Sequence, residues 1–428
     1  MKKNILLALP FVFCTSVFGQ VKTNSELKKM INESFGYFPK IKEAENSVSI
    51  ANEKLQSVSL SNNPDIRFNS GYNYIMPEIS FPINGKEIQF QPVNNLAAAV
   101  GSNYTLFDFG KLKASVEKSK LGIKIAKDNI QLVKAGLANQ IAAVYYNIIY
   151  FQKAISIQDS MILFYLAAKQ LAENKFKNGE ALNLDILSLK ANIDAEKNNK
   201  IDLESGLKKQ VNLLNYITGT EKIDGKDFDF EIEDINPEAG ISIAEQNNPV
   251  FKIAGDQIIQ SKSEIDIIKL QNKPSIAVNA ATGIRNGYVP DVNELRFNYM
   301  AGVSFNFPIY SFGKTKQQIK LQESYVKQNE LSKISLASTY KKDIEQAKVD
   351  FYNNTEKIKN SYSQIDAATM ARKITFSRYQ NGVATYLDVM AAATQVQKAT
   401  LSQLQYQYQL CVSKITLANL LGYEYWNN

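Results

Sequence analysis

The sequence predicts an α+β membrane chain with an internal two-fold repeat, in which each repeat joins two short strands to one very long helix. Three observations predict this fold. Two halves of the chain match at a nearly constant offset, segments of about ten residues alternate with period two, and apolar residues recur every seven positions in proline-free stretches. Each observation is taken in turn below.

The chain begins with a segment typical of a secretory leader. Lys2 and Lys3 precede an apolar run from Ile5 to Phe18. This run is shorter than the roughly 20 residues that a membrane-spanning helix needs, and it has no polar face, which disfavours an amphipathic surface helix. We therefore expect a signal peptide at residues 1–19, cleaved after Gly19.

Composition limits the classes of function that the chain can have. The 428 residues include no histidine, and the formal net charge of +7 is too modest to indicate a nucleic-acid partner. No glycine-rich phosphate loop or clustered cysteine pair occurs, so we expect no enzyme activity, no cofactor and no metal site. The mature chain keeps only Cys411, so packing or oligomerisation must stabilise it without an intrachain disulfide.

The repeat is visible in the spacing of matching motifs. Pro39 and Pro64 match Pro249 and Pro274 at an offset of 210, whereas Leu106–Gly110 and three later matches have an offset of 203. The matching pairs at 203 are Leu106–Gly110 with Ile309–Gly313, Phe176–Ala181 with Tyr379–Ala384, Asp185 with Asp388, and Gly219 with Gly422. The second half is therefore seven residues shorter than the first between the second proline of each pair and the strand exit.

The change of offset locates a loop, because loops absorb length changes and packed elements do not. The longer version is residues 76–92, with three prolines and an Asn-Gly pair, and the shorter version is 286–294. We assign residues 20–220 to the first repeat and 239–428 to the second. The acidic segment 221–238 is the expected linker, with a short strand near 228–232.

Two stretches can hold very long helices because they lack proline, namely the residues between Pro92 and Pro237 and those after Pro308. In the first stretch apolar residues recur every seven positions: Val116, Ile123, Ile130, Leu137, Val144 and Phe151. Sustained heptads indicate a coiled coil. A helix over residues 110–179 would be on the order of 100 Å long, and residues 314–377 offer a second helix of similar length.

Each long helix is preceded by two segments that alternate with period two. They cover about residues 66–74 and 96–107 in the first half, and 276–285 and 297–307 in the second. One face is apolar and aromatic, and the other is small and polar. About ten residues is the length of a tilted strand that crosses a bilayer. The alternative is a soluble sandwich, in which the apolar face would be the core.

Four strands cannot close a barrel, and open strand edges in lipid leave backbone N–H and C=O groups unpaired. Two copies would give eight strands, whose interior is filled by side chains, whereas three copies would give twelve. The strands therefore favour a homotrimer with a twelve-stranded β-barrel, to which each protomer contributes four strands.

The duplicated plan of two strands and a long helix resembles the TolC-like outer-membrane efflux proteins, also called outer membrane factors. The strand exits Leu106–Gly110 and Ile309–Gly313 share this resemblance, as do the paired Asn-Gly turns that precede an aspartate. The resemblance implies a trimeric barrel in the outer-membrane lipid of a Gram-negative bacterium, continued by a coiled-coil helical barrel in the periplasm. It also implies two partners, a periplasmic adaptor (membrane fusion protein) and an inner-membrane pump of the RND or ABC type. The chain would then be the passive channel of a tripartite efflux or type I secretion system.

The resemblance further implies a periplasmic tip and an aperture. The tip positions, expected to contact the adaptor, are Asn178, Gly179, Ala181, Leu182, Asn381, Gly382, Val383, Ala384 and Thr385. Asp185 and Asp388 match aspartates that line or approach the closed mouth of the tunnel in the family. The sequence from Thr385 to Asp388 also fits a helix capping box, so the aspartates could instead only cap helices.

A different class of function remains open beside the channel. The leader and the heptads alone would also suit a periplasmic coiled-coil scaffold or an adhesin without channel activity. Such a protein would wash off membranes with salt, whereas a channel would need detergent to leave the outer membrane.

Overall fold

The computed structural model describes residues 21–83, 85–233 and 237–427, and it divides into two compact units. Unit 1 comprises Met1–Lys42, Gln131–Phe251 and Leu336–Asn428, and unit 2 comprises Glu43–Ile130 and Lys252–Ser335. The expected signal peptide lies outside the described residues. Because both long helices contribute residues to each unit, the units are described below one at a time.

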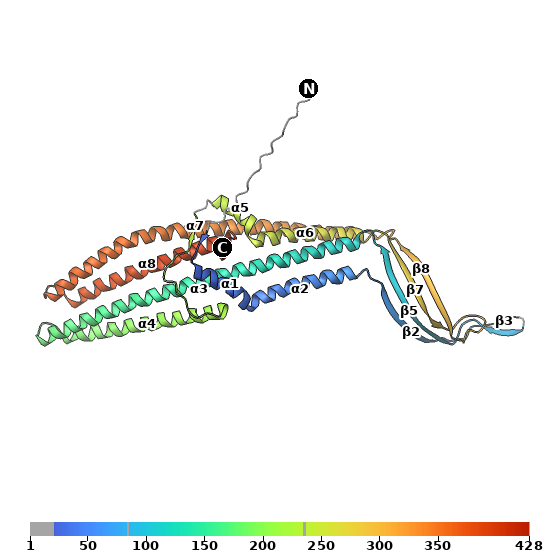
Figure 1. Ribbon diagram of the computed structural model, residues 1–428, viewed down its shortest axis with the longest axis horizontal. Helices are drawn as coiled ribbons and strands as arrows, with labels where there is room; N and C mark the ends of the chain where they lie inside the picture. The colour runs from blue at the N-terminus through green and yellow to red at the C-terminus, as the bar shows by residue number, and fades with distance from the viewer. Residues whose placement is uncertain (1–20, 84, 234–236, 428) are drawn as a thin grey trace, which may run out of the picture. The chain divides into compact units, whose positions relative to one another are not determined.

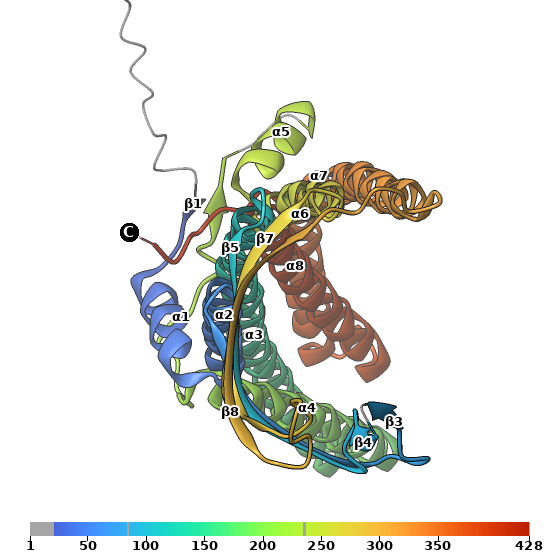
Figure 2. The same cartoon turned by 90° about the vertical axis from the view of Figure 1, so that its right-hand side faces the viewer.

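Unit 2 contains an antiparallel sheet with the strand order β2-β5-β7-β8, which curves along its width (Figures 1 and 2). The strands are β2 (Asp65–Tyr74), β5 (Asn94–Phe107), β7 (Ser275–Arg285) and β8 (Arg296–Asn306). All four strands that the sequence predicts are confirmed. The pairing of β5 with β7 joins the two repeats into one sheet, and β2 and β8 are its outer strands among the described residues.

The apolar face of this sheet is exposed in the single chain. On β8, Phe297 is 72% exposed, Tyr299 82% and Val303 71%. On β2, all ten residues are exposed, including Ile66 and Phe68. In a soluble sandwich these side chains would be buried against a second sheet. The structure therefore excludes the sandwich alternative for this sheet and agrees with a lipid-facing surface.

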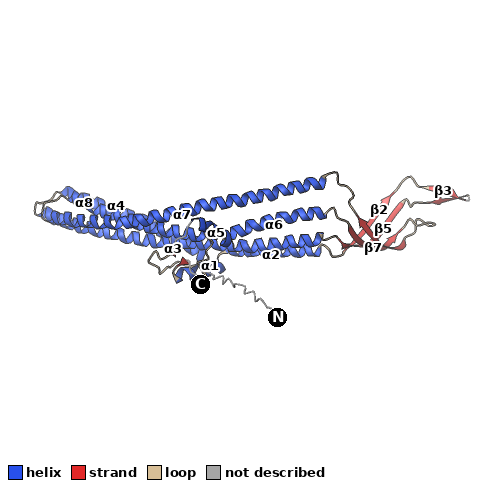
Figure 3. Cartoon of the chain, turned by 90° about the horizontal axis from the view of Figure 1, so that it is seen from above, coloured by secondary structure: helices blue, strands red, loops and turns tan. Residues whose placement is uncertain are grey.

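A hairpin that the sequence reasoning missed occupies the longer loop between β2 and β5. It consists of β3 (Ser80–Ile83) and β4 (Lys86–Gln89), and Figure 3 shows it beyond the ends of the sheet strands. The rings of Phe81 and Phe90 meet edge to face with centroids 5.7 Å apart. The sequence predicts only a loop for residues 76–92, because strands of four residues are too short to show a clear alternation of apolar and polar residues.

The chain turns from strand to long helix in the same way in both repeats. Phe109 and Phe312 have φ values of 55° and 47°, and the glycines that follow, Gly110 and Gly313, have 91° and 80°. Glycine adopts this left-handed region at little cost, whereas a phenylalanine there is uncommon. After each corner a helix of 67 residues begins: α3 (Lys111–Lys177) and α7 (Lys314–Gln380). The two long helices are thus confirmed.

Shorter helices complete both repeats. They are α1 (Ser25–Tyr37), α2 (Pro39–Leu60), α4 (Asn183–Thr218), α5 (Pro237–Asn247), α6 (Pro249–Leu270) and α8 (Tyr386–Leu420). The matched prolines Pro39 and Pro249 are the first residues of α2 and α6, where proline's missing N–H costs nothing, and both helices have 22 residues. None of the helices in the described part of the chain is long and apolar enough to cross a membrane.

The main core of unit 1 surrounds two neighbouring tyrosines of α3. Tyr145 and Tyr146 are fully buried, and they lie in a cluster with residues of α1, α4, α8 and the segment between the repeats. The Tyr146 hydroxyl donates to Asp229 Oδ1 at 2.7 Å, and the Tyr145 hydroxyl donates to Glu26 Oε2 at 2.7 Å. Buried hydroxyls need such partners, so the two tyrosines tie α3 to both α1 and the linker.

The linker is held at a second place by a small sheet. β1 (Val21–Lys22) pairs with β6 (Glu231–Ile232), which lies within the range where the sequence suggests a short strand. Glu26 also accepts the backbone N–H groups of Asp224 and Gly225, at 2.7 and 3.0 Å. Residues 21–26 therefore hold the linker in place within unit 1. The exact repeat boundaries stay a prediction.

Gly225 is the position where this arrangement is most sensitive to a single change. A Cβ atom there would lie 1.8 Å from the Tyr145 hydroxyl, whereas a Cβ at Gly136 in α3 would meet nothing within 4 Å. We expect Gly225→Ala to destabilise the linker by about 1–3 kcal/mol. Gly136→Ala, the control, should be neutral or stabilising by up to about 1 kcal/mol. Faster hydrogen exchange over residues 221–233 in Gly225→Ala alone would confirm this, and equal exchange in both variants would contradict it.

Candidate gate and docking tip

The two helical hairpins of unit 1 end in turns with the same geometry. Gly179 and Gly382 have φ values of 77° and 73°. The N–H of Glu180 bonds to Lys175 O, and the N–H of Val383 bonds to Arg378 O, both at 2.8 Å. These are Schellman motifs, which satisfy the last carbonyls of α3 and α7 and require a left-handed residue. Both glycines therefore occupy positions that other residues fill only under strain.

The starts of the return helices differ between the repeats. At α8, Thr385 Oγ1 accepts the Asp388 N–H at 3.2 Å, and Asp388 Oδ2 accepts the Thr385 N–H at 2.9 Å. This is a complete capping box. At α4, Asp185 Oδ2 accepts the Leu182 N–H at 3.3 Å, but the Leu182 side chain has no acceptor to return the bond. The first repeat therefore has only half of the box.

Capping keeps Asp388 charged. The hydrogen bonds from the Thr385 side chain and backbone, with a smaller contribution from the Arg378 charge, lower the pKa of its carboxyl below the usual value of 3.8. The side chain remains exposed while it caps the helix. Asp388 can therefore cap α8 and still present a charged carboxylate at an aperture.

The structure also brings together residues that the sequence reasoning missed. Lys175, which is only 9% exposed, lies 3.4 Å from Glu180 Oε2, and its Nζ lies 5.7 Å from the centre of the Tyr379 ring. Burial raises the pKa of the Tyr379 hydroxyl, and the charge of Asp185 raises it further. Lys175 and Asp185 therefore both act on Tyr379, which links the tips of the two hairpins. The sequence repeat pairs Phe176 with Tyr379, but it gives no sign that Tyr379 contacts Lys175.

Behind the turns, a small cluster packs the two hairpins together. Its buried members are Met161, Tyr165, Ala168, Ala172, Leu189, Ile193, Met390 and Ala393. A polar node follows it, in which Gln397 Nε2 donates to Gln158 Oε1 at 3.0 Å and to Glu196 Oε2 at 3.1 Å. Since Gln158 is 2% exposed, this node joins α3, α4 and α8 through buried polar bonds.

Large apolar side chains cover the outside of the tip. Those that are more than half exposed are Leu182, Leu184, Leu187, Val383 and Leu387. Single exposed apolar residues are common, but a group of them at two adjoining turns is typical of a protein contact surface. The predicted tip residues thus lie on such a surface, and Asp185 and Asp388 lie in the first turns behind it.

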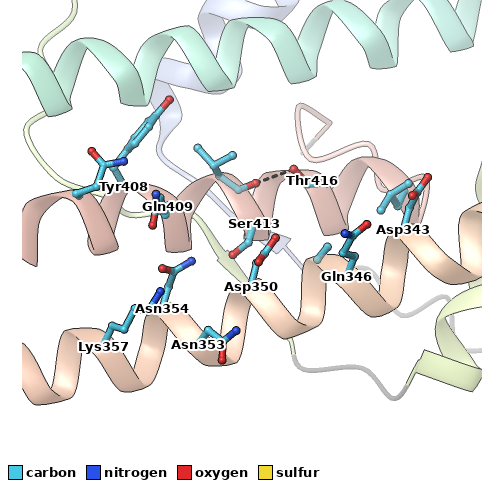
Figure 4. Close-up of a pocket in the computed structure, with 14 residues that line it drawn as sticks. Asp343, Gln346, Asp350, Asn353, Asn354, Lys357, Tyr408, Gln409, Ser413 and Thr416 are labelled. Atoms are coloured by element: carbon cyan, nitrogen blue, oxygen red, sulfur yellow. Dashed lines mark hydrogen bonds between the residues drawn. The ribbon is translucent and has the colours of Figure 1, made fainter. Parts of the chain in front are cut away.

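A polar groove of about 620 Å³ runs between α7 and α8 (Figure 4). Asp343, Asp350 and Lys357 of α7 line it together with Gln409 and Ser413 of α8. The described residues contain no group of three metal-ligating side chains. The groove is a polar, open surface between two helices.

Two substitutions test how much the caps of α8 and α4 stabilise these helices. Thr385→Ala removes half of a complete capping box and should cost about 1 kcal/mol, whereas Leu182→Thr supplies the missing half at α4 and should stabilise it by a similar amount. Hydrogen exchange of the first turns of α8 and α4 measures both effects. Equal protection of either turn in the variant and the parent would show that the cap has no role.

The lowered pKa of Asp388 also predicts a pH dependence. A carboxyl whose pKa is lower in the folded state stabilises the fold above its unfolded pKa, and this stability is lost as pH falls through the folded pKa. The normalised protection of the first turn of α8 should therefore stay constant from pH 7 to about pH 4 and fall below that. In Thr385→Ala the folded pKa rises towards the unfolded value, so the fall should be smaller and should end at a higher pH. An unchanged profile would contradict this assignment.

Comparisons with known proteins agree with this geometry. The family model described as "Outer membrane efflux protein" matches residues 32–220 and 240–423. Among solved structures, the outer-membrane channel OprN covers 94% of this chain and 91% of its own, with 15% identity and a TM-score of 0.77. The CmeC outer membrane channel of Campylobacter jejuni covers 99% of this chain and 94% of its own, with 14% identity and a TM-score of 0.75.

A curated relative agrees at the level of sequence. Nodulation protein T of Rhizobium leguminosarum bv. trifolii is 18% identical over 332 residues, which are 74% of this chain and 70% of that protein. The family consists of channel proteins rather than enzymes, in line with the expectation from composition. Since the family model covers most of the chain, this protein belongs to the outer membrane efflux proteins, a family of the Gram-negative outer membrane with a large periplasmic portion.

Proposed function

We propose that three copies of this chain form the outer-membrane channel of a tripartite efflux or type I secretion system. In this trimer, β8 of one protomer pairs with β2 of the next and closes a twelve-stranded barrel. The observation that supports it is the four-stranded sheet, whose apolar face is exposed and whose outer strands β2 and β8 have no neighbour among the described residues.

The lipid environment supplies the driving force for this assembly. Each unpaired backbone group at a strand edge costs several kcal/mol in hydrocarbon, and β2 and β8 would each expose a row of them. An eight-stranded barrel of two copies would be filled by its own side chains, whereas twelve strands leave a water-filled lumen. Three copies therefore satisfy the strand edges and also leave a path for substrates.

The aperture of this channel would be two rings of carboxylates. Three copies of Asp185 and three of Asp388 would surround the axis near the tip, where they attract cations and repel anions as acidic rings do in cation channels. The lowered pKa of Asp388 keeps its ring charged at neutral pH. The contact of Lys175 with Tyr379 would hold the hairpins together in the closed state.

The tip would also be the docking site for a periplasmic adaptor. The turn residues Asn178, Gly179 and Ala181 in one hairpin, and Asn381–Thr385 in the other, lie beside the exposed Leu182, Val383 and Leu387. An apolar surface of this kind suits a protein partner. The adaptor would connect the channel to an inner-membrane pump of the RND or ABC type, which supplies the energy because the channel conducts passively.

The size and solubility of the purified protein separate this channel from a scaffold or adhesin. The mature protein should leave the outer-membrane fraction only with detergent and should have the mass of a trimer in the micelle. Extraction by salt alone, followed by a stable monomer in water, would overturn the proposal and favour the periplasmic scaffold.

Planar bilayers test the aperture. The combined change Asp185→Asn and Asp388→Asn keeps the hydrogen-bond acceptors but removes the charges, so we expect cation selectivity to fall severalfold. Asp194→Asn is the control, because that carboxylate already pairs with Lys197 at 3.5 Å. Unchanged selectivity in the double variant would remove the two aspartates from the aperture, while a trimer that never conducts would overturn the channel itself.

A further inference from the structure

The two strand-to-helix corners of unit 2 share a motif that the channel function does not use. Phe109-Gly110-Lys111-Leu112-Lys113 in the first repeat corresponds to Phe312-Gly313-Lys314-Thr315-Lys316 in the second. In both, an exposed aromatic residue with positive φ precedes a glycine and two lysines spaced by one residue. The same order of ring, glycine and two charges therefore recurs where the sheet ends and each long helix begins.

The lysines of these corners lack ion-pair partners within the described chain. Lys111, Lys113, Lys314 and Lys316 are all exposed, and none of them forms an ion pair with a described residue. The nearby acids are engaged elsewhere, because Asp65 pairs with Arg67 and Asp108 Oδ1 accepts the Gly110 N–H at 3.0 Å. The corners thus carry four lysines that no described carboxylate pairs with.

This charge is unfavourable for the helices that carry it. Neither α3 nor α7 has an acidic residue in its first turn. The positive end of the helix dipole favours acids and disfavours cations there. Asp108 caps α3 and offsets part of this cost in the first repeat, whereas Ser311, at the matching position of the second, carries no charge. The first-turn lysines therefore oppose helix stability most at α7, and an external anion is the simplest source of compensation.

The strand register gathers the corners at one end of the sheet. Phe107 of β5 pairs with Ile276 of β7, and Ser275 of β7 pairs with Asn306 of β8. Exposed Lys273, just before β7, therefore lies between the two corners, and Asn272 accepts a bond from Thr315 Oγ1 at 3.0 Å. We define the basic collar as Lys111, Lys113, Lys273, Lys314 and Lys316.

Aromatic side chains lie on the membrane side of the collar. The rings of Phe107 and Phe109 meet at 4.6 Å, and those of Tyr310 and Phe312 meet at 4.7 Å, in the same edge-to-face geometry. Tyr310 is 73% exposed and Phe312 89%. Aromatic residues favour the boundary between acyl chains and headgroups, so the lysines that follow them along the chain would lie at the level of the phosphates.

We propose that the basic collar binds the phosphate headgroups of anionic phospholipids in the periplasmic leaflet of the outer membrane. Charge complementarity supports phospholipid headgroups as the ligand. Each protomer would place five lysines without ion-pair partners at the level of the lipid phosphates. The aromatic pairs contact the upper acyl chains and fix that depth. The inference rests on the membrane-inserted trimer proposed above but not on its conduction.

Spin-labelled lipids test the collar directly. With the trimer reconstituted in phosphatidylcholine bilayers, we expect spin-labelled phosphatidylglycerol to associate about 5-fold or more strongly than spin-labelled phosphatidylcholine, because one lysine near an anionic surface already contributes about that factor. The quadruple change of Lys111, Lys113, Lys314 and Lys316 to Gln should lower this preference severalfold, to at most the contribution of the remaining Lys273. High salt should reduce the preference in the parent.

A matched control removes the same charge elsewhere. Lys190, Lys208, Lys209 and Lys341 are exposed helical lysines outside the collar, and changing them to Gln should leave the preference intact. The four-lysine change to Arg at the collar should also preserve it. An equal loss in the control, or a preference that survives the collar variant, would overturn the proposal.

Two further arms keep the result interpretable. If the quadruple variant fails to form trimers, the pairs Lys111→Gln with Lys113→Gln and Lys314→Gln with Lys316→Gln each remove one corner, and each should lower the preference. If inorganic phosphate abolishes the preference when chloride at equal ionic strength does not, the collar binds free phosphate and the lipid assignment is wrong. Conduction should be unchanged in every collar variant, so a parent that never conducts would count against the proposed function alone.

Discussion

The need to pair every backbone group of a membrane strand governs this structure. The sheet of one chain has two outer strands, β2 and β8, and an apolar face that no described element covers. In water such a face would be buried by a second sheet, and in lipid it needs no cover, but the edges then have to find partner strands. The proposed trimer satisfies this requirement, and the positions of the aromatic residues and lysines at the strand ends follow from the same boundary between lipid and water.

The internal duplication repeats this plan twice with small differences. Both repeats have a helix of 22 residues that begins with proline, a corner with positive φ and a helix of 67 residues. Apart from the β3–β4 hairpin in the longer loop of the first repeat, the repeats differ at single side chains: Asp108 caps α3 where Ser311 stands in the second repeat, and Thr385 caps α8 where Leu182 stands in the first. The repeats therefore share a backbone while their helix ends differ in local stability.

The elements that the sequence predicts well are those whose periodicity extends over many residues. The four sheet strands and both long helices are recovered almost to their ends, because alternation and the lack of proline act over the whole element. The β3–β4 hairpin is missed because each strand has only four residues and Pro82 interrupts it. The contact of Lys175 with Tyr379 is missed for another reason, since it joins two hairpins about 200 residues apart and depends on packing that spacing does not encode.

The distribution of packing within unit 1 bears on how such a tip could open. The main core around Tyr145 and Tyr146 has 22 buried members, among them six aromatic residues, whereas the cluster behind the tip has eight, of which three are alanine. Small side chains bury little apolar area, so separating them costs less free energy than separating the main core. Other links between the hairpins near the tip include the Lys175–Tyr379 contact, the ring contact of Phe164 with Phe376, and the hydrogen bonds of Gln397 with Gln158 and Glu196. Water can replace the polar ones when the helices part. Segments that move are drawn from the less stable parts of a structure, so the tip can rearrange while the linker and the main core hold the two hairpins in place.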